Sequence, residues 1–378
     1  MKRLILIPLL LGTISSAKEI PLNSSKVCQK CHPLIYNEYR ESMHRKASIF
    51  NDEVHKAVWD KHPLKKKNKY TCKKCHSPVD TKLRTVPQKN EIQLNEPISC
   101  VYCHQIQDIE YHTQANENIL TTKKDTLYGA RKSKQNEKDV KYEVKSSFFG
   151  LITKQEGSPF HHIDFSNKNY YSAKTCMGCH SHKQNSHGLN VCETNFQQKG
   201  KANCIECHMP KVPGSFTTLK ESKTHRFHGF AGVSHHSEML AKYVDLKLEK
   251  LSNSFQVTIE NKAGHELLLH PLRLAQLHVK VYRDGKIIFS DIKSFKRVIG
   301  KDKKSAPPWV AVEVVENTQI KPYEKRVIEF GFTLQKGDQV DIALGFYKVD
   351  PAMAKKLGIK EKENFKFHIL KKFEMEIE

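Results

Sequence analysis

The pentapeptide Cys-x-x-Cys-His occurs five times in this 378-residue chain, and no other feature constrains the possible folds as strongly. In this motif two thiols add to the vinyl groups of a haem, and the histidine becomes the proximal ligand of the iron. Chance placement of 11 cysteines and 21 histidines would give about 0.02 copies. The chain therefore predicts five covalently attached haems c, at Cys28, Cys31 and His32; Cys72, Cys75 and His76; Cys100, Cys103 and His104; Cys176, Cys179 and His180; and Cys204, Cys207 and His208.

Other uses of paired cysteines fit this pattern less well. A disulfide framework places no demand on the residue after the second cysteine. Structural zinc needs two Cys-x-x-Cys pairs, or one pair with spaced histidines. A thioredoxin-like redox motif would occur once, in a βαβ context. The motifs use ten of the eleven cysteines, and the remaining Cys192 is best interpreted as a small buried apolar residue.

The first residues are typical of an export signal. Met1-Lys2-Arg3 is a charged n-region, Leu4 to Gly12 is a short apolar run, and Ser15-Ser16-Ala17 is a small-residue cleavage site. We expect residues 1–17 to be removed and a soluble mature chain to begin near Lys18. No later segment approaches about 18 apolar residues, so no transmembrane segment is expected in the mature chain. A periplasmic location fits, because c-type haem is attached after export.

The formal net charge of the chain is +22, or +20 once Lys2 and Arg3 are removed. Five ferric haems with ionised propionates would lower the charge of the holoprotein to about +15. This excess suits acidic redox partners or an anionic lipid surface, and it equally suits a solvated basic face. Nucleic acid is a poor partner for an exported haem protein. If the edge of the second haem is exposed, the expected docking patch is Lys65-Lys66-Lys67-Asn68-Lys69.

The motifs all lie between Cys28 and His208, at intervals of 44, 28, 76 and 28 residues between first cysteines. The two equal short intervals suggest two haem pairs. None of the intervals is long enough for a separate apolar core, so short helices and long loops should wrap closely spaced haems. Residues 115–146 are polar and lysine-rich and should form an extended surface segment. These observations predict a haem domain over residues 18–251.

Residues 252–378 contain no cysteine and show alternating apolar residues, which predict strands. Asp284-Gly285 separates two such runs and predicts a tight hairpin. About seven short strands suggest a β-sandwich. The predicted fold class is α+β, a mostly helical and loop multihaem c-type cytochrome domain followed by a C-terminal β-sandwich-like domain. The expected strands lie within Phe255–Ile259, Leu277–Tyr282, Ile287–Phe289, Val310–Val315, Arg326–Leu334, Val340–Val349 and Phe365–Ile377.

The second axial ligand of each iron decides what such a protein does. A haem with two histidine ligands has no open position and can only pass electrons. A haem with an open or water-filled face can bind and reduce a small molecule. Sixteen histidines remain after the five proximal ones are counted, and local sequence context must select among them.

Several local patterns beside the motifs also occur in a known family. They are Tyr39 with Ser42-Met43-His44 and Ala47, Ser158-Pro159-Phe160-His161, Met209-Pro210, His225-Arg226-Phe227 with Gly229, His235-His236, and Asn261 to Leu267 followed by Arg273. With them the chain resembles the multihaem cytochromes of the cytochrome c-554 and hydroxylamine oxidoreductase type, over nearly the whole mature sequence. It departs from that pattern in having Tyr39 where Trp is common and Leu268-Leu269-His270 where relatives have Pro-Thr-Gly.

The resemblance implies a set of distal ligands. One of them would return from the C-terminal domain, and five candidates for five irons favour complete bis-histidine ligation. His162 is an alternative to His161, His235 is an alternative to His236, and His112 is a reserve. The implied distal ligands are His44, His161, His225, His236 and His265. Surface or packing roles are expected for His55, His62, His182, His187, His278 and His368.

Two functions follow from these expectations. The first is periplasmic electron transfer between redox proteins such as other cytochromes, a quinol dehydrogenase or a reductase. The second is a terminal reductase for a small nitrogen or sulfur compound at one five-coordinate haem. No Cys-x-x-Cys-Lys motif occurs, and no visible motif positions a tyrosine to cross-link a haem. Both observations favour the electron carrier. The basic surface would also allow peripheral association with a membrane.

Overall fold

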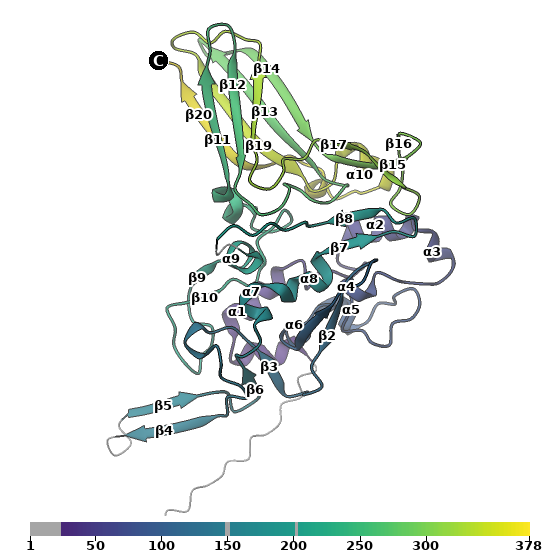
Figure 1. Ribbon diagram of the computed structural model, residues 1–378, viewed down its shortest axis with the longest axis vertical. Coiled ribbons are helices and arrows are strands. Elements are labelled where there is room, and N and C mark those ends of the chain that lie inside the picture. The colour runs from purple at the N-terminus through teal and green to yellow at the C-terminus, as the bar shows by residue number, and fades with distance from the viewer. Residues whose placement is uncertain (1–23, 148–151, 201–202) are drawn as a thin grey trace, which may run out of the picture.

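The computed structural model describes residues 24–147, 152–200 and 203–378. The predicted export signal, residues 1–17, lies outside the described residues. The described part of the chain mixes short helices with several small sheets, which fits the predicted α+β class. No helix in those residues is both long and apolar enough to cross a bilayer. In Figure 1 the first half of the chain forms a helix and loop region, and the strands of the C-terminal part rise above it.

The helices of the first region are short, and most of them carry or follow a motif. Asn203 caps one of them, because its side chain accepts hydrogen bonds from the backbone of Ile205 and Glu206. Four motifs end on a single helical turn, and the first begins in the 3₁₀ helix Ser25–Lys30 and ends at His32, just before α1. This places the cysteines and histidine of each motif on one face. The α-helices are α1 Pro33–Glu41, α2 Glu53–Lys61, α3 Pro63–Lys66, α4 Lys73–His76, α5 Glu91–Asn95, α6 Cys100–His104, α7 Asn169–Ser172, α8 Met177–His180 and α9 Cys204–His208.

Five two-stranded sheets connect these helices. The predicted surface segment 115–146 runs through two strands and into a third, and most of its side chains are exposed. Only one of the five pairs is parallel, that of β3 with β6. The pairs are β1 Ile106–Glu110 with β2 Glu117–Leu120, β3 Thr126–Tyr128 with β6 His162–Asp164, β4 Glu143–Ser147 with β5 Ile152–Glu156, β7 His182–Gln184 with β8 Asn190–Glu193, and β9 Lys211–Pro213 with β10 Thr224–Arg226.

The C-terminal part contains two larger antiparallel sheets, and one hydrophobic core draws buried residues from both. Phe255, Val257 and Ile259 alternate with half-buried residues along β12, as the sequence pattern predicts. The first sheet orders β11 Val244–Lys250, β12 Phe255–Asn261 and β18 Lys325–Phe330. The second orders β14 Lys286–Phe295, β13 Leu274–Arg283, β19 Gln339–Tyr347 and β20 His368–Glu376. A third sheet orders β16 Lys304–Ser305, β15 Arg297–Lys301 and β17 Glu313–Asn317, and helix α10 spans Pro351–Leu357.

Two local expectations have clear outcomes. The hairpin at Asp284-Gly285 is confirmed, since both residues have positive φ, 51° and 72°, and join β13 to β14. The strand predicted at Val310–Val315 is wrong in its first half, because β17 begins only at Glu313. The backbone N–H groups of Val310 and Ala311 both donate to the carbonyl of Pro307 and form a turn instead.

Candidate functional site

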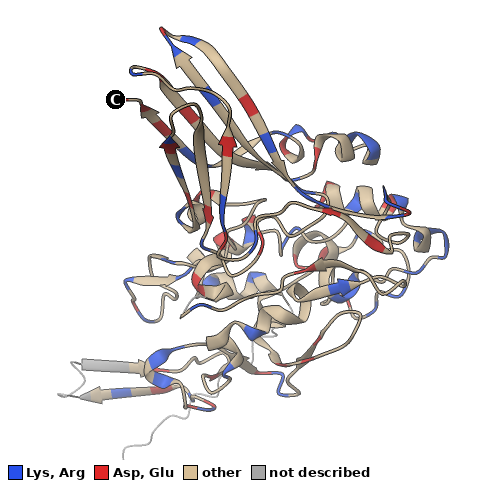
Figure 2. Ribbon diagram, turned by 45° about the horizontal axis from the view of Figure 1, so that its top comes forward, with Lys and Arg blue, Asp and Glu red and all other residues tan. Residues whose placement is uncertain are grey.

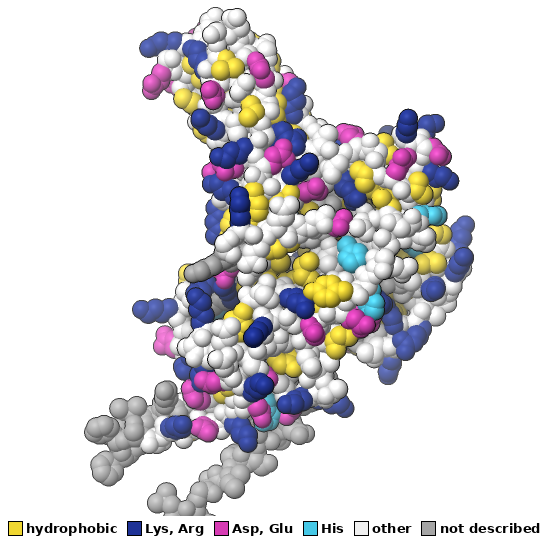
Figure 3. All heavy atoms as spheres, viewed as in Figure 1, with side chains coloured by type: hydrophobic (Ala, Val, Ile, Leu, Met, Phe, Trp, Pro, Cys, Tyr) yellow, Lys and Arg dark blue, Asp and Glu magenta, His cyan; other side chains and the backbone are white. Residues whose placement is uncertain are grey.

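One large cavity of about 3740 Å³ lies within the molecule, and all fifteen cysteines and histidines of the five motifs line it. Ordinary ligand pockets have volumes of roughly 300–1,000 Å³, so this space is several times larger. On the face shown in Figure 3, hydrophobic and histidine side chains come together below the C-terminal part of the molecule. The size of the cavity and its lining fit several large apolar groups held side by side.

Four of the proximal histidines are oriented by a backbone carbonyl. In each, ring Nδ1 donates to a carbonyl oxygen and leaves Nε2 for an iron. Within the described residues, the His180 ring makes no such bond. The four bonds are from His32 to Phe216 at 2.6 Å, from His76 to Ala47 at 3.1 Å, from His104 to Tyr128 at 2.7 Å, and from His208 to Ala231 at 2.6 Å.

Thiols of different motifs lie in direct contact. The Cys28 thiol interacts with that of Cys100, so the first and third motifs are neighbours. In the same way Cys75 meets Cys179, which joins the second motif to the fourth. The fourth motif also meets the fifth through Cys176 and Cys204. Cys103 lies close enough to the cysteines of the fourth motif to raise their pKa values, so the third and fourth motifs are also neighbours.

Three proximal histidines face a second imidazole across the cavity. The ring centroids are 6.4 Å apart for His104 and His228, 6.0 Å for His180 and His44, and 6.0 Å for His208 and His265. Two imidazoles bound to one metal through bonds of about 2 Å have centroids about 6 Å apart. The three pairs therefore have the spacing of two axial ligands on one iron.

Burial keeps these distal imidazoles neutral, which is the form that binds a metal. Burial, followed by the nearby His180 ring, lowers the pKa of His44 to about 3. Burial, followed by His104, lowers the pKa of His228 to about 3. The pKa of His265 is also lowered, first by burial. The Nδ1 atom of His44 is buried without a hydrogen-bond partner in the described structure.

Among the predicted distal ligands, His44 and His265 lie about 6 Å from a proximal histidine, whereas His225 lies elsewhere. Both ring nitrogens of His225 are engaged, Nδ1 with the Gly214 carbonyl at 3.0 Å and Nε2 with Glu38 Oε1 at 2.9 Å. His228, three residues later, faces His104 instead. The chain carries His-x-Phe-x-Gly twice, beginning at His225 and at His228, and this repeated pattern is a signal that could have pointed to His228.

The two predicted alternatives at 161 and 162 separate in the structure. His161 lines the cavity, and its pKa is lowered by burial and then by nearby charges that include His32. His162 instead lies 3.3 Å from the Asp125 carboxylate and 2.7 Å from that of Asp139. His161 is thus the one of the pair that faces the cavity near the first motif.

His236, its alternative His235, and the reserve histidine occupy other positions. His236 bonds Glu238 through Nδ1 at 2.9 Å and packs against the His235 ring, with centroids 4.0 Å apart. His236 is not among the residues that line the cavity, whereas His235 is. His112 lies 3.6 Å from Glu110 at the surface. In the described residues, the rings of His112, His235 and His236 do not contact the ring of any proximal histidine.

The second motif has a different environment. The His55 ring lies only 4.0 Å from that of His76, and both rings donate to the Ala47 carbonyl, so His55 is a packing neighbour. Among the described ring contacts, none places a histidine about 6 Å across from His76. Instead His270 and Arg273 line the cavity nearby. Burial, and then the charges of Arg273 and His76, lower the pKa of His270 to about 3.

Comparison with known proteins agrees with this geometry. Residues 27–105 match the family described as cytochrome c554 and c-prime. A penta-haem cytochrome c552 from Thermochromatium tepidum shares the fold, with a TM-score of 0.71 and 20% identity over 94% of this chain and 100% of that chain. A CARDB domain from Pyrococcus furiosus, solved with di-metal ions, aligns over 36% of this chain and 90% of that one at 14% identity. Its TM-score of 0.16 is too low to indicate a shared fold. No curated protein matches.

The motifs, the cavity that they line and the matching family together define a multihaem c-type cytochrome. The match over residues 27–105 and the shared fold of a penta-haem cytochrome c support a multihaem cytochrome with five covalently bound haems c. Cys192, the cysteine outside the five motifs, lies in β8. Burial raises the pKa of its thiol, which fits a packing residue.

Proposed function

We propose that this protein is an exported cytochrome that transfers electrons between redox proteins of the periplasm. The observation that carries the proposal is the closeness of the motif thiols. Direct contacts link the first motif to the third and the fourth to both the second and the fifth, and Cys103 lies close to the cysteines of the fourth motif. Such an uninterrupted series serves conduction rather than five separate reactions. When bound, each haem supplies a reversible one-electron oxidation and reduction.

The residues of the chain contribute position, ligation and burial. Each pair of cysteines ties a haem edge to a fixed helical turn, and the carbonyl bonds of the proximal histidines hold their Nε2 atoms toward the cavity. His44, His228 and His265 supply the second ligand at three sites, and we assign His161 to the site of His32. Two imidazole ligands leave no open position, which suits electron transfer.

The C-terminal strands complete one of these sites. We assign them to a sandwich-like unit that begins near Val244, because β11 precedes the predicted boundary at residue 251 and pairs with β12 along its whole length. The two larger sheets share one core, which holds the loop after β12 in place. That loop carries His265 into the cavity opposite His208.

Charge supports docking to acidic redox partners. Lys and Arg positions are spread along the ribbon of both parts of the molecule (Figure 2). The run from Lys65 to Lys69 is exposed, and Lys69 with Thr71 lines the cavity beside Cys72. A partner bound at this patch would therefore lie close to the second motif. The same charge would support peripheral binding to anionic lipid, and raised ionic strength should weaken either contact.

A second candidate function rests on the environment of His76. If His270 does not ligate this iron, the site keeps an open face beside the buried Arg273 guanidinium, which would attract a small oxyanion. The protein would then reduce a small nitrogen or sulfur compound there. If His270 does ligate the iron, all five sites are closed and only electron transfer remains.

Electron paramagnetic resonance of the oxidised holoprotein distinguishes the two. Five low-spin ferric centres, with no carbon monoxide adduct after reduction, would support the carrier and exclude the reductase. A high-spin signal from one centre in five, with carbon monoxide binding, would contradict a pure carrier. In the first case His270→Ala should convert one low-spin centre to high spin. In the second case Arg273→Gln should lower turnover with nitrite or hydroxylamine as the probe.

A further inference from the structure

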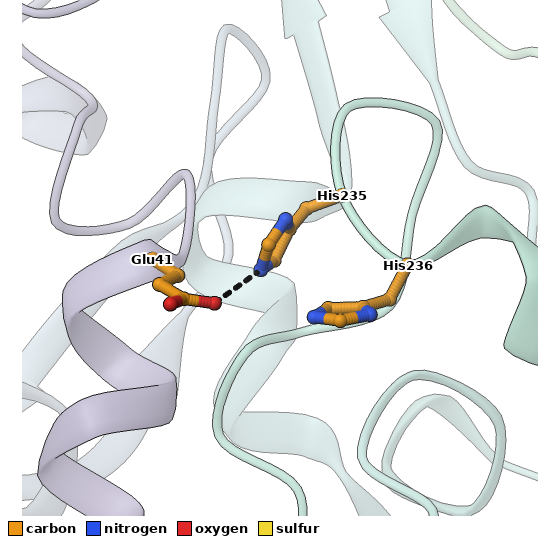
Figure 4. A group of neighbouring side chains, drawn as sticks. All are labelled: Glu41, His235 and His236. Carbon is orange, nitrogen blue, oxygen red and sulfur yellow. Dashed lines mark ion pairs between the residues drawn. The ribbon is translucent and has the colours of Figure 1, made fainter.

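Three potential ligand groups converge at the surface where α1 ends. Glu41 is the last residue of α1, and His235 and His236 lie in the loop that precedes the 3₁₀ helix Ser237–Tyr243 (Figure 4). Each residue offers one ligand atom, and these atoms all lie within 4.8 Å of one another. Figure 4 shows the His235 ring turned toward the Glu41 carboxylate, and Nε2 and Oε2 are 3.7 Å apart.

His235 presents a ring nitrogen that nothing in the described structure satisfies. Its Nε2 is buried without a hydrogen-bond partner, which is costly for a polar atom. The backbone that carries it is fixed by a pair of hydrogen bonds with Gly232, of 2.7 and 3.2 Å.

His236 is oriented by an outer partner. Its Nδ1 bonds the Glu238 carboxylate at 2.9 Å and leaves Nε2 unused, which is the arrangement in which carboxylates support metal-binding histidines. The residue adopts the left-handed backbone conformation, with φ 52° and ψ 41°, which is uncommon outside glycine. Its ring packs edge-on against Phe227, with centroids 5.0 Å apart. A strained residue held by two contacts indicates that its direction is specified.

We propose that Glu41, His235 and His236 bind one divalent transition-metal ion of the class that prefers imidazole, with Zn²⁺ as the representative. Such an ion needs bonds of about 2.0–2.1 Å, which places tetrahedral ligand atoms about 3.3 Å apart. The Glu41 side chain is 67% exposed and free to make the small adjustment. Three protein ligands leave a fourth position for water. Two imidazoles with one carboxylate also suit Fe²⁺, Ni²⁺ and Cu²⁺.

The ion would fasten the end of α1 to the 232–236 loop. This connection matters because the distal ligand His44 lies three residues after Glu41. The ring of Phe230, just before the loop, packs 4.1 Å from that of His44. Metal binding would therefore stabilise the packing around one axial ligand. This role differs from the distal-ligand role that the sequence resemblance implies for His236.

Zinc titration of the tag-free holoprotein, after removal of bound metal with a chelator, tests the proposal. We expect one Zn²⁺ per chain by calorimetry and a higher thermal midpoint in its presence. Glu41→Gln, His235→Ala and His236→Ala should each weaken binding at least 100-fold, and Glu238→Gln should weaken it about tenfold. His187→Ala, which removes an exposed histidine elsewhere, is the matched control and should bind zinc like the wild type.

The absorption spectrum of each variant reports whether it has folded, since all five haems must remain low-spin or unchanged from the wild type. Two results would overturn the proposal. One is zinc binding that the three ligand variants leave as tight as in the control. The other is a new high-spin haem signal in His235→Ala or His236→Ala, which would make that histidine an axial haem ligand instead.

Discussion

Replacing His265 with alanine should open one iron of the five and leave the other four unchanged. His265 lies on the loop that follows β12, and its ring stacks across the cavity from His208 with 17° between their planes. Without this imidazole the iron held by His208 keeps one protein ligand. A ferric haem with one strong ligand becomes high-spin and binds carbon monoxide after reduction.

The size of the effect follows from how rigidly the loop is held. The Asn261 side chain donates to the His265 carbonyl at 2.9 Å and to that of Lys321 at 2.8 Å. At Gly264 a Cβ atom would lie only 2.4 Å from the Gln197 carbonyl oxygen, so any larger residue there would force the backbone to shift. The loop therefore has no room to bring another residue to the iron. We expect complete conversion of this site, so about one fifth of the haem iron should turn high-spin.

The assay is electron paramagnetic resonance of the oxidised protein with spin quantification, together with carbon monoxide titration of the reduced protein. Added imidazole should restore the low-spin state of His265→Ala by filling the vacated position. His278→Ala is the control, because this half-buried histidine of β13 bonds only Gln276 in the described contacts. Gly264→Ala should give a partial loss of the low-spin signal and cost about 1–3 kcal/mol of stability. An unchanged low-spin spectrum for His265→Ala would refute the involvement of the C-terminal part in haem ligation.

Two further predictions concern the other distal sites and the β-rich part. His228→Ala should convert the iron of the third motif to high spin. His225→Ala should leave the spin state of every haem as in the wild type. The opposite pair of results would make His225 the distal ligand. The hydrogen bonds from Arg283 hold the pKa of the buried Asp338 carboxylate below its ordinary value, so their stabilisation is complete above about pH 4 and is lost as the pH falls through the lower folded value. Asp338→Asn should lower the free energy of unfolding by about 1–3 kcal/mol at pH 7, and the difference from the wild type in urea unfolding should shrink as the pH falls through the lowered pKa of Asp338. A difference that persists undiminished at low pH would contradict this account.

The covalent half of each site could be predicted from sequence because it is local. A Cys-x-x-Cys-His pentapeptide brings its own three reactive groups together on one helical turn, whatever the rest of the chain does. The strands of the C-terminal part were equally predictable, because burial on one face forces alternation, as along β12. The shift of β17 from Val310 to Glu313 follows from the turn at Pro307, which alternation alone does not reveal.

The distal half of each site is not local, and sequence alone could not assign it. His228 and His104 are separated by more than a hundred residues, and only the fold decides that His228 rather than His225 faces the cavity. Both histidines begin the same His-x-Phe-x-Gly pattern, so a family resemblance can be aligned in either register. What separates them is that Glu38 and Gly214 occupy both nitrogens of His225.

The loop between β12 and β13 holds the choice between carrier and reductase. It places His265 opposite His208, and eight residues later it buries Arg273 beside His270. The Gln319 side chain, which donates to the carbonyl of Leu268, holds the stretch Leu268-Leu269-His270 in place.

Because Leu268 has a positive φ of 59°, the chain reverses there and turns His270 back toward the cavity. A glycine at position 270 would leave the iron of His76 with an open face, whereas a histidine offers it a second imidazole. His270→Gly should therefore raise carbon monoxide binding by one equivalent if the wild type is a closed carrier, and should leave it unchanged if that face is already open.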